Sequence, residues 1–406
     1  MRVSTASRYE STVDSLQRRQ ADLSEAQMQM ASGKRVNRPS DDPTAAARAE
    51  RAHIAQQRLV AEQRSVDVSR NAMALAEAAL GQAGEVMQQA RESMVAAGNA
   101  SYGPGERAAV AKHLQQLRGQ LLSLANQHDS AGGYTFGGQG STSQPFLDAI
   151  GGVVFAGTAG QAQVSASEQM PVTVDGENLW LGARSGNGVF VTDTPRDPLS
   201  RLTTNTGTGW IDSGGVTNPG ALTGDAYQIV FSDSGGGVMV YDVLRNGAPT
   251  AVVGAPYTSG ASITVDGMSF DISGRPAAGD VFTLDPAAPG LDVFDALDRA
   301  IAVLQDGSAN GGEVSQAVSN GLRDLDAVMG HLQAARSVAG SALSRLDSID
   351  SRNQDRALWA KSVQSDAEDL DMVQAVSDFQ NQQTSYQAAL QTYAMVQRLS
   401  LFDYIK

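Results

Sequence analysis

Cysteine is absent from this chain of 406 residues, and aromatic side chains make up only 5% of it. Without cysteine, the chain can form neither a disulfide framework nor a thiolate metal site, and it has no cysteine nucleophile. Basic residues are also scarce, with 30 Lys and Arg against 44 Asp and Glu, which gives a net charge of −14. Binding to a nucleic-acid backbone requires clustered Lys and Arg, so this composition argues against that role.

Long apolar runs are missing as well. No window approaches the roughly 18 uninterrupted apolar residues of a membrane span. Residues 1–25 also lack the apolar core of a secretory signal, which needs at least about seven such residues. We therefore expect no membrane-spanning helix and no cleaved signal peptide.

Signatures of catalysis are absent too. The four histidines show no metal-ligand spacing, and the chain has neither a nucleophile elbow nor a phosphate-binding glycine loop. Asp175 and Glu177 are residue types that a glycosidase could use, but solvated charge is the plainer interpretation. We expect a non-enzymatic protein without cofactor or metal, and an enzyme confined to the middle of the chain is a minor alternative.

Glycine is concentrated in the middle of the chain. Residues 132–290 hold 29 of the 42 glycines and carry a net charge of −9, whereas both arms are rich in Ala, Gln, Ser and Arg. The composition of the arms favours helix. The middle contains short β-branched and aromatic runs separated by Gly, Asn, Asp and Pro, a pattern typical of antiparallel strands. The runs lie at 151–156, 171–176, 227–231, 238–243, 262–272 and 280–284.

The predicted fold is therefore α+β, with a long helical bundle and coiled coil built from both termini and an inserted antiparallel β domain. We expect terminal helices in residues 1–42 and 364–406. A helical bundle would comprise residues 43–131 and 291–363. The β domain would occupy residues 132–290, as one or two subdomains.

The bundle helix predicted for residues 43–97 has a strict repeat. Asp42 before Pro43 provides an N-cap followed by proline at the first helical position. Large apolar residues then recur every seven positions, which favours a left-handed supercoil with a partner helix. The repeat comprises Leu59, Val66, Met73, Leu80, Met87 and Met94. Apolar residues with 3–4 spacing over 318–346 supply the partner, and further helices are expected at about 105–129 and 291–305.

Both terminal segments carry a narrow apolar seam with alternating spacings of four and three residues. The first seam comprises Tyr9, Val13, Leu16, Leu23 and Met30. The second comprises Met372, Val376, Phe379, Tyr386, Leu390 and Tyr393. Gln20 and Gln383 interrupt the two seams at the same place in the pattern, and polar interruptions of this kind fix register at some cost in stability.

Two interpretations of the seams remain open. The terminal helices could pack on the bundle of their own chain, or they could pair with each other and with copies from neighbouring molecules. Two thin helices without a third layer bury little apolar surface against the entropy lost on ordering them. We therefore expect ends that are mobile in the free chain and helical after assembly.

The termini also carry sequence motifs that resemble the flagellin superfamily. Residues 31–49 resemble its amino-terminal signature, and residues 368–405 resemble the carboxyl end of its hook-associated members. The matching signature residues are Ser32, Gly33, Arg35, Val36, Asn37, Asp41 and Asp42. Pro43 after the aspartate pair, and an ending without the leucine-rich flagellin tail, distinguish the chain from filament flagellins.

The resemblance implies a structural adaptor between the bacterial flagellar hook and the filament. It implies an inner coiled-coil layer made from both termini, and export through the flagellar type III apparatus to an extracellular position. The implied partners are like subunits in a ring-like oligomer, the hook-side junction protein, flagellin, and an export chaperone at the C-terminal helix. No nucleic acid or membrane is expected as a partner. The alternatives are a filament-forming flagellin and a junction protein whose β insert also binds a surface ligand.

The segment between the first terminal helix and the bundle contains a cluster of charged and polar residues. It comprises Arg35, Asn37, Arg38, Asp41 and Asp42. We expect these residues to form ion pairs between subunits or helix caps at the kink between the two layers. The alternative is one helix cap surrounded by solvated charges.

Overall fold

The computed structural model describes residues 5–129, 132–139, 142–165, 168–197 and 203–404, with side chains described for all of these except residues 5–9, 164–165 and 396–404. The chain forms two compact units. One comprises Met1–Arg64 with Ser348–Lys406, and the other comprises Ser65–Asp347. Two long helices, α2 (Pro43–Ala97) and α6 (Gly311–Glu368), contribute residues to both units.

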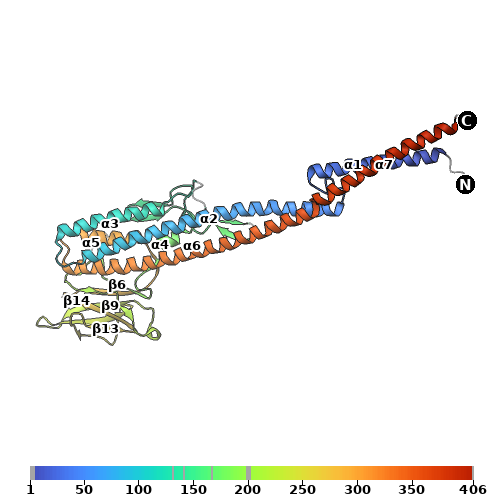
Figure 1. Ribbon diagram of the computed structural model, residues 1–406. Coiled ribbons are helices and arrows are strands. Elements are labelled where there is room, and N and C mark those ends of the chain that lie inside the picture. Colours follow the sequence, from blue (N-terminus) through green and yellow to red (C-terminus); the bar gives the residue numbers. More distant parts are fainter. Residues whose placement is uncertain (1–4, 130–131, 140–141, 166–167, 198–202, 405–406) are drawn as a thin grey trace. The chain divides into compact units, whose positions relative to one another are not determined.

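Helices α2 and α6 run side by side in the larger unit (Figure 1). Ion pairs connect them along their length: Arg70–Asp347 at 3.0 Å, Arg91–Asp326 at 2.7 Å and Arg336–Glu77 at 2.6 Å. The predicted seven-residue repeat is confirmed as the packing face of α2 in this unit. Its members there are at most 2% exposed: Val66, Met73, Leu80, Met87 and Met94. Leu325, Val328 and Leu332 of α6 belong to the same core as Leu80, Met87 and Met94.

Two further helices complete the bundle. They are α3 (Pro104–Ala125) and α5 (Val293–Gln305), which pack against each other. The helix predicted for about 105–129 ends earlier than expected because Asn126 leaves the helix and pairs with the backbone of Phe146. Its Oδ1 accepts from the Phe146 N–H, and its Nδ2 donates to the Phe146 carbonyl, both at 2.9 Å.

A small aromatic cluster extends the bundle core. Trp180 lies on the short helix α4 (Gly176–Leu181), is 1% exposed, and contacts Phe136, Phe146 and Phe294. This helix corrects one sequence prediction, because a strand had been expected over residues 171–176. The strand ends at Pro171, and the Asp175 side chain then caps α4 by accepting from the Asn178 N–H. Helix capping therefore overrides the β-branched pattern here.

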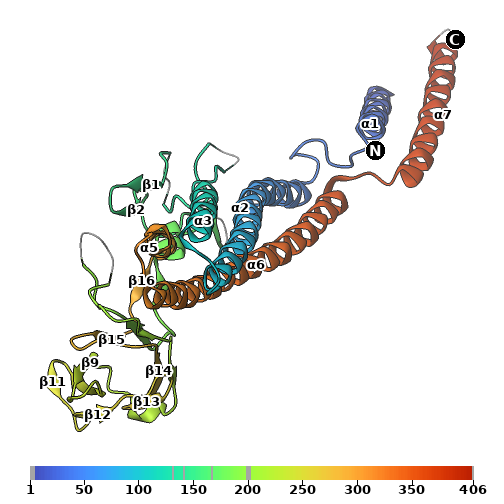
Figure 2. The same ribbon diagram turned by 90° about the vertical axis from the view of Figure 1, so that its left-hand side faces the viewer.

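The remaining strand predictions are confirmed, and the strands pair antiparallel. The main sheet has the order β11-β10-β9-β15-β6, with β12 pairing with β10, and a second sheet joins β13, β14, β7 and β8. The main sheet contains β6 (Phe190–Asp193), β9 (Tyr227–Asp233), β10 (Met239–Arg245), β11 (Ala248–Pro249), β12 (Ala255–Pro256) and β15 (Val281–Pro286). The second contains β7 (Trp210–Ile211), β8 (Gly215–Val216), β13 (Ser262–Val265) and β14 (Met268–Ser273). Figure 2 shows these strands from a second direction.

The other elements in the described part of the insert are three two-stranded sheets and one short helical turn. They are β1 (Phe146–Ala149) with β2 (Gly152–Phe155), β3 (Gln163–Ser165) with β4 (Gln169–Pro171), β5 (Ala183–Arg184) with β16 (Pro289–Leu291), and the 3₁₀ turn η1 (Pro219–Ala221). The run at 262–272 is a hairpin whose turn contains Asp266 and Gly267, both at positive φ. A Cβ on Gly267 would lie 2.2 Å from the Asn218 carbonyl oxygen, so this position requires glycine.

Polar side chains of α6 connect the bundle to the β strands. We refer to Gln316, Asn320, Arg323 and Asp324 as the polar latch. Gln316 acts like a neighbouring strand, accepting from the Ile211 N–H at 2.8 Å and donating to the Ile211 carbonyl at 3.1 Å. Asn320 donates to the Asp193 carboxylate at 2.8 Å, and Arg323 donates to the Thr192 carbonyl at 2.5 Å. The latch thereby satisfies backbone groups at strand edges that have no strand partner there.

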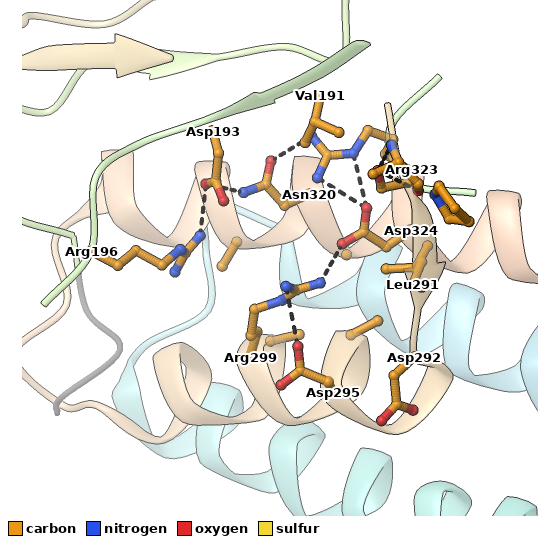
Figure 3. Close-up of a pocket in the computed structure, with 18 residues that line it drawn as sticks. Val191, Asp193, Arg196, Leu291, Asp292, Asp295, Arg299, Asn320, Arg323 and Asp324 are labelled. Carbon is orange, nitrogen blue, oxygen red and sulfur yellow. Dashed lines mark hydrogen bonds and ion pairs between the residues drawn. The ribbon is translucent and has the colours of Figure 1, made fainter. Parts of the chain in front are cut away.

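A cavity of about 230 Å³ adjoins the polar latch (Figure 3). Arginines and aspartates alternate around it and neutralise one another, with Asp324 accepting from both Arg323 and Arg299. The lining holds four aspartates and three arginines, so most of its charges neutralise one another. Across the described residues, no group of three or more acidic or histidine side chains is placed to hold a metal ion.

Asp292, beside the same cavity, makes stability depend on pH. It caps α5 through the Phe294 N–H at 2.7 Å, and its burial, together with the nearby Asp295 and Asp298, raises its pKa to about 6. Between about pH 4 and pH 6 the folded chain therefore binds more protons than the unfolded chain, so the free energy of unfolding falls as pH rises. We expect a loss of about 2–3 kcal/mol across this window.

Asp292→Asn keeps the capping acceptor but removes this titration. Denaturant unfolding of both proteins from pH 4 to pH 7 checks the prediction, because other titrating groups cancel in the difference between them. The variant is expected to gain stability relative to the parent as pH rises to 6. A difference that stays constant over this range would contradict the assignment.

Candidate assembly surface

The smaller unit contains the two terminal helices. They are α1 (Thr5–Ser32) and α7 (Met372–Tyr404), which pack against each other with the start of α1 and the end of α7 at the same end of the pair (Figure 1). The prediction that the termini form helices that pair is thus confirmed. Within the described part of the chain, no helix is long and apolar enough to cross a membrane.

The apolar seams of this pair are only partly covered. Among the described side chains of α1 and α7, none is buried. The half-buried seam residues are Val13, Leu16, Leu23, Met30, Phe379, Tyr386 and Tyr393. Met372, Val376 and Leu390 are more open still, at 47%, 42% and 42% exposed. The side chain of Tyr9 lies outside the described side chains.

This exposure contrasts with the stripe of α2 in the larger unit, where the repeat residues are at most 2% exposed. A seam between only two helices is covered from one side, so part of each side chain stays in contact with water. Gln20 and Gln383, the two polar interruptions, are both exposed. The pair therefore offers a periodic apolar surface that a further helix layer could cover.

The segment after α1 is held by backbone hydrogen bonds to the break between α6 and α7. Gly33 ends α1 at φ +69°, and its carbonyl accepts from the Leu370 N–H at 3.0 Å. The Arg35 N–H donates to the Glu368 carbonyl at 2.7 Å. Lys34 adds an ion pair with the Glu368 carboxylate at 2.9 Å. These bonds join residues more than 330 positions apart, and no local sequence pattern predicted them.

The structure brings the five predicted kink residues together in the segment between α1 and α2. Arg35 forms an ion pair with Asp42 at 3.3 Å and donates to the Ala367 carbonyl at 3.0 Å. The Asp41 carboxylate accepts from the Asn37 N–H at 3.1 Å and the Arg38 N–H at 2.8 Å. The partners shown are caps and ion pairs within one chain. A role for these residues between subunits stays a prediction.

Asp42 is the N-cap of α2, as the sequence predicted. Its Oδ1 accepts from the Ala45 N–H at 3.0 Å, the Thr44 N–H at 3.1 Å and the Thr44 hydroxyl at 2.8 Å. The Ala45 bond and then the Thr44 hydroxyl are the main causes that lower the pKa of Asp42 to about 2. The cap is therefore fully present above about pH 4 and is lost as pH falls towards 2.

Asp42→Ala should loosen the first turn of α2 without unfolding the chain, because two backbone N–H groups lose their acceptor. We expect amide hydrogen exchange at Thr44 and Ala45 to accelerate several-fold at neutral pH, while exchange in the middle of α2 stays unchanged. Asp42→Asn retains an acceptor oxygen and serves as the matched control. Equal exchange in the alanine variant and the parent would show that this cap does not hold the turn.

Comparison with known proteins agrees with this architecture. Residues 3–141 match the model of the bacterial flagellin N-terminal helical region. The chain is 26% identical to flagellar hook-associated protein 3 of Escherichia coli (strain K12) over 410 residues, which covers 100% of both proteins. It is 24% identical to flagellin D of Rhizobium meliloti over 352 residues, covering 82% of this chain and 83% of that protein.

A solved crystal structure has a similar fold. The crystal structure of Xanthomonas campestris FlgL matches with a TM-score of 0.68 and 27% identity, covering 78% of this chain and 99% of that one. These relatives are structural proteins of the flagellum rather than enzymes. Over its full length the chain is therefore similar to flagellar hook-associated protein 3, FlgL, and its residues 3–141 match the flagellin N-terminal helical region.

Proposed function

We propose that this protein is the adaptor that joins the flagellar hook to the filament, and that it assembles through α1 and α7. The observation that carries the proposal is the partly exposed seam on these two helices, in a chain that is similar throughout to hook-associated protein 3. Apolar side chains that complete their burial only against other subunits provide affinity without any chemistry. The protein would then act at the extracellular hook–filament junction.

In this proposal the chain contributes to three structural layers of the junction. Residues 1–42 and 364–406 form the inner layer on assembly, and residues 43–131 and 291–363 form the bundle around it. Residues 132–290 carry a net charge of −9 and provide a solvated outer surface. The partners are like subunits, the hook-side junction protein and flagellin, with an export chaperone at α7 before assembly.

A filament-forming flagellin is the second candidate, favoured by the match to flagellin D. The copy number in isolated flagella separates the two. An adaptor is a trace component that remains at the hook end, whereas a flagellin is the bulk of the filament. Quantitative mass spectrometry of purified flagella measures this ratio directly.

Electron microscopy of bacteria that lack the protein tests the adaptor role. We expect hooks without filaments and flagellin released into the medium, both reversed by the intact gene. A gene that encodes a chain ending at residue 369 should produce stable protein but leave the hooks bare. Full-length filaments on the deletion strain would refute the proposal.

A further inference from the structure

A second surface of the smaller unit combines exposed apolar and basic side chains. We refer to Arg51, Ile54, Arg58, Arg356 and Trp359 as the basic groove, a depression of about 560 Å³ between α2 and α6. Trp359 is 69% exposed, and Ile54 is 41% exposed. Side-chain bonds between the two helices, Gln56–Gln364 at 2.8 Å and Gln63–Asp350 at 2.7 Å, hold the groove walls together.

Arg58 and Arg356 of the basic groove differ from the three arginines that connect α2 and α6 in the larger unit. Arg70, Arg91 and Arg336 each pair with an acidic residue of the opposite helix. Arg58 and Arg356, in contrast, form no ion pair with any described residue, and Glu62 is the one acidic side chain in the described lining of the groove. Exposed tryptophan and arginine at one site are the residue types that dominate binding energy at protein interfaces.

The chain itself contains a surface with the opposite properties. Residues 366–378, the acidic segment, contain five acidic residues and no basic residue. Glu368 is engaged by Lys34, but the carboxylates of Asp366, Asp371 and Asp378 form no ion pair with described residues. The segment also presents Val373 at 85% exposed and Met372 at 47% exposed. It thus offers negative charge that complements the arginines of the groove, and apolar side chains that can contact Trp359 and Ile54.

We infer that the basic groove of one copy binds the acidic segment of a second copy. The inference rests on the proposed function, because it specifies the contact between like subunits. A chain cannot fill its own groove with this segment, since α6 continues as helix from Trp359 to Asp366, the first residue of the segment, which separates them by about 10 Å. The two surfaces are different, so the contact is heterologous and repeats from copy to copy into a ring or helix.

Cysteine cross-linking can test this contact because the parent chain has no cysteine. Ala55, which lines the groove, and Val373 are replaced by cysteine in one chain, and isolated flagella are treated with a short bismaleimide. The double variant A55C/V373C should give a ladder of dimers and larger oligomers, whereas each single variant should stay monomeric. Dimers from A55C alone would indicate a two-fold contact and overturn the inference.

Charge reversal provides the second measurement. Arg58→Glu with Arg356→Glu should reduce the yield of cross-linked oligomers at least tenfold. Asp366→Arg with Asp378→Arg in the same chain should restore that yield. Arg48→Glu with Lys361→Glu, exposed cations of the same helices outside the groove lining, is the matched control and should leave it unchanged. Normal filaments without any ladder would refute this contact and leave the adaptor role intact, whereas normal filaments in the deletion strain would refute the adaptor role itself.

Discussion

Phe379→Asp is expected to reduce the amount of this protein in isolated hook–filament structures at least tenfold. Phe379 lies in the seam of α7 and is half-buried in the single chain. Full burial of such a side chain contributes about 1.5–3 kcal/mol, so completing the burial of the half-buried Phe379 would contribute about 1 kcal/mol. Burying a carboxylate at the same place costs about a further 1–3 kcal/mol. About 1.4 kcal/mol corresponds to a tenfold change in an equilibrium constant. One substitution per subunit is therefore enough to reduce incorporation of the protein tenfold. Quantitative immunoblotting of flagella and of culture medium measures the change.

The soluble chain should tolerate the same substitution. The buried apolar clusters of the described residues lie in the larger unit and contain no residue of α7, so the melting temperature should change by no more than about 2 °C. Ser377→Asp places the same charge at an exposed position on the other side of α7 and should assemble normally. A large melting shift with Phe379→Asp, or equal loss of assembly with Ser377→Asp, would contradict the seam hypothesis.

Features with a local or periodic signal were predictable from the sequence. Asp42 and Pro43 fixed the first residue of α2, and the seven-residue repeat identified its packing face. The terminal seams were predicted from their 4–3 spacing. The degree of exposure was not predictable, because it depends on how many helices surround the seam and not on the periodicity itself.

Features that depend on distant residues could not be predicted. Gln316 and Asn320 are polar residues on a helix, a pattern typical of a solvated face, yet they are 4% and 7% exposed because strand edges cover them. The hydrogen bond from Arg35 to the Glu368 carbonyl likewise has no sequence signal, since backbone groups are the same in every residue. The basic groove required the three-dimensional pairing of α2 and α6, which brings Arg58 and Arg356 to one surface.

The polar latch gives the largest expected effect on stability. The Asp324 side chain is 4% exposed and accepts from Arg323 at 2.9 Å and from Arg299 at 3.0 Å. Asp324→Ala would leave the guanidinium of Arg323, itself 6% exposed, buried without a carboxylate. Removing one member of a buried ion pair costs about 3–5 kcal/mol, because the remaining charge is neither paired nor hydrated. We expect the larger unit to melt about 10 °C lower in calorimetry.

Asp326, two residues further along α6, is the matched control. It also pairs with an arginine, Arg91 at 2.7 Å, but the two side chains are 52% and 38% exposed. Asp326→Ala should therefore cost less than about 1 kcal/mol, since water solvates both charges when the pair is broken. The two variants remove the same group from the same helix, so the difference between them isolates burial. If both variants lower the melting temperature equally, burial of the Asp324 charge does not contribute to stability.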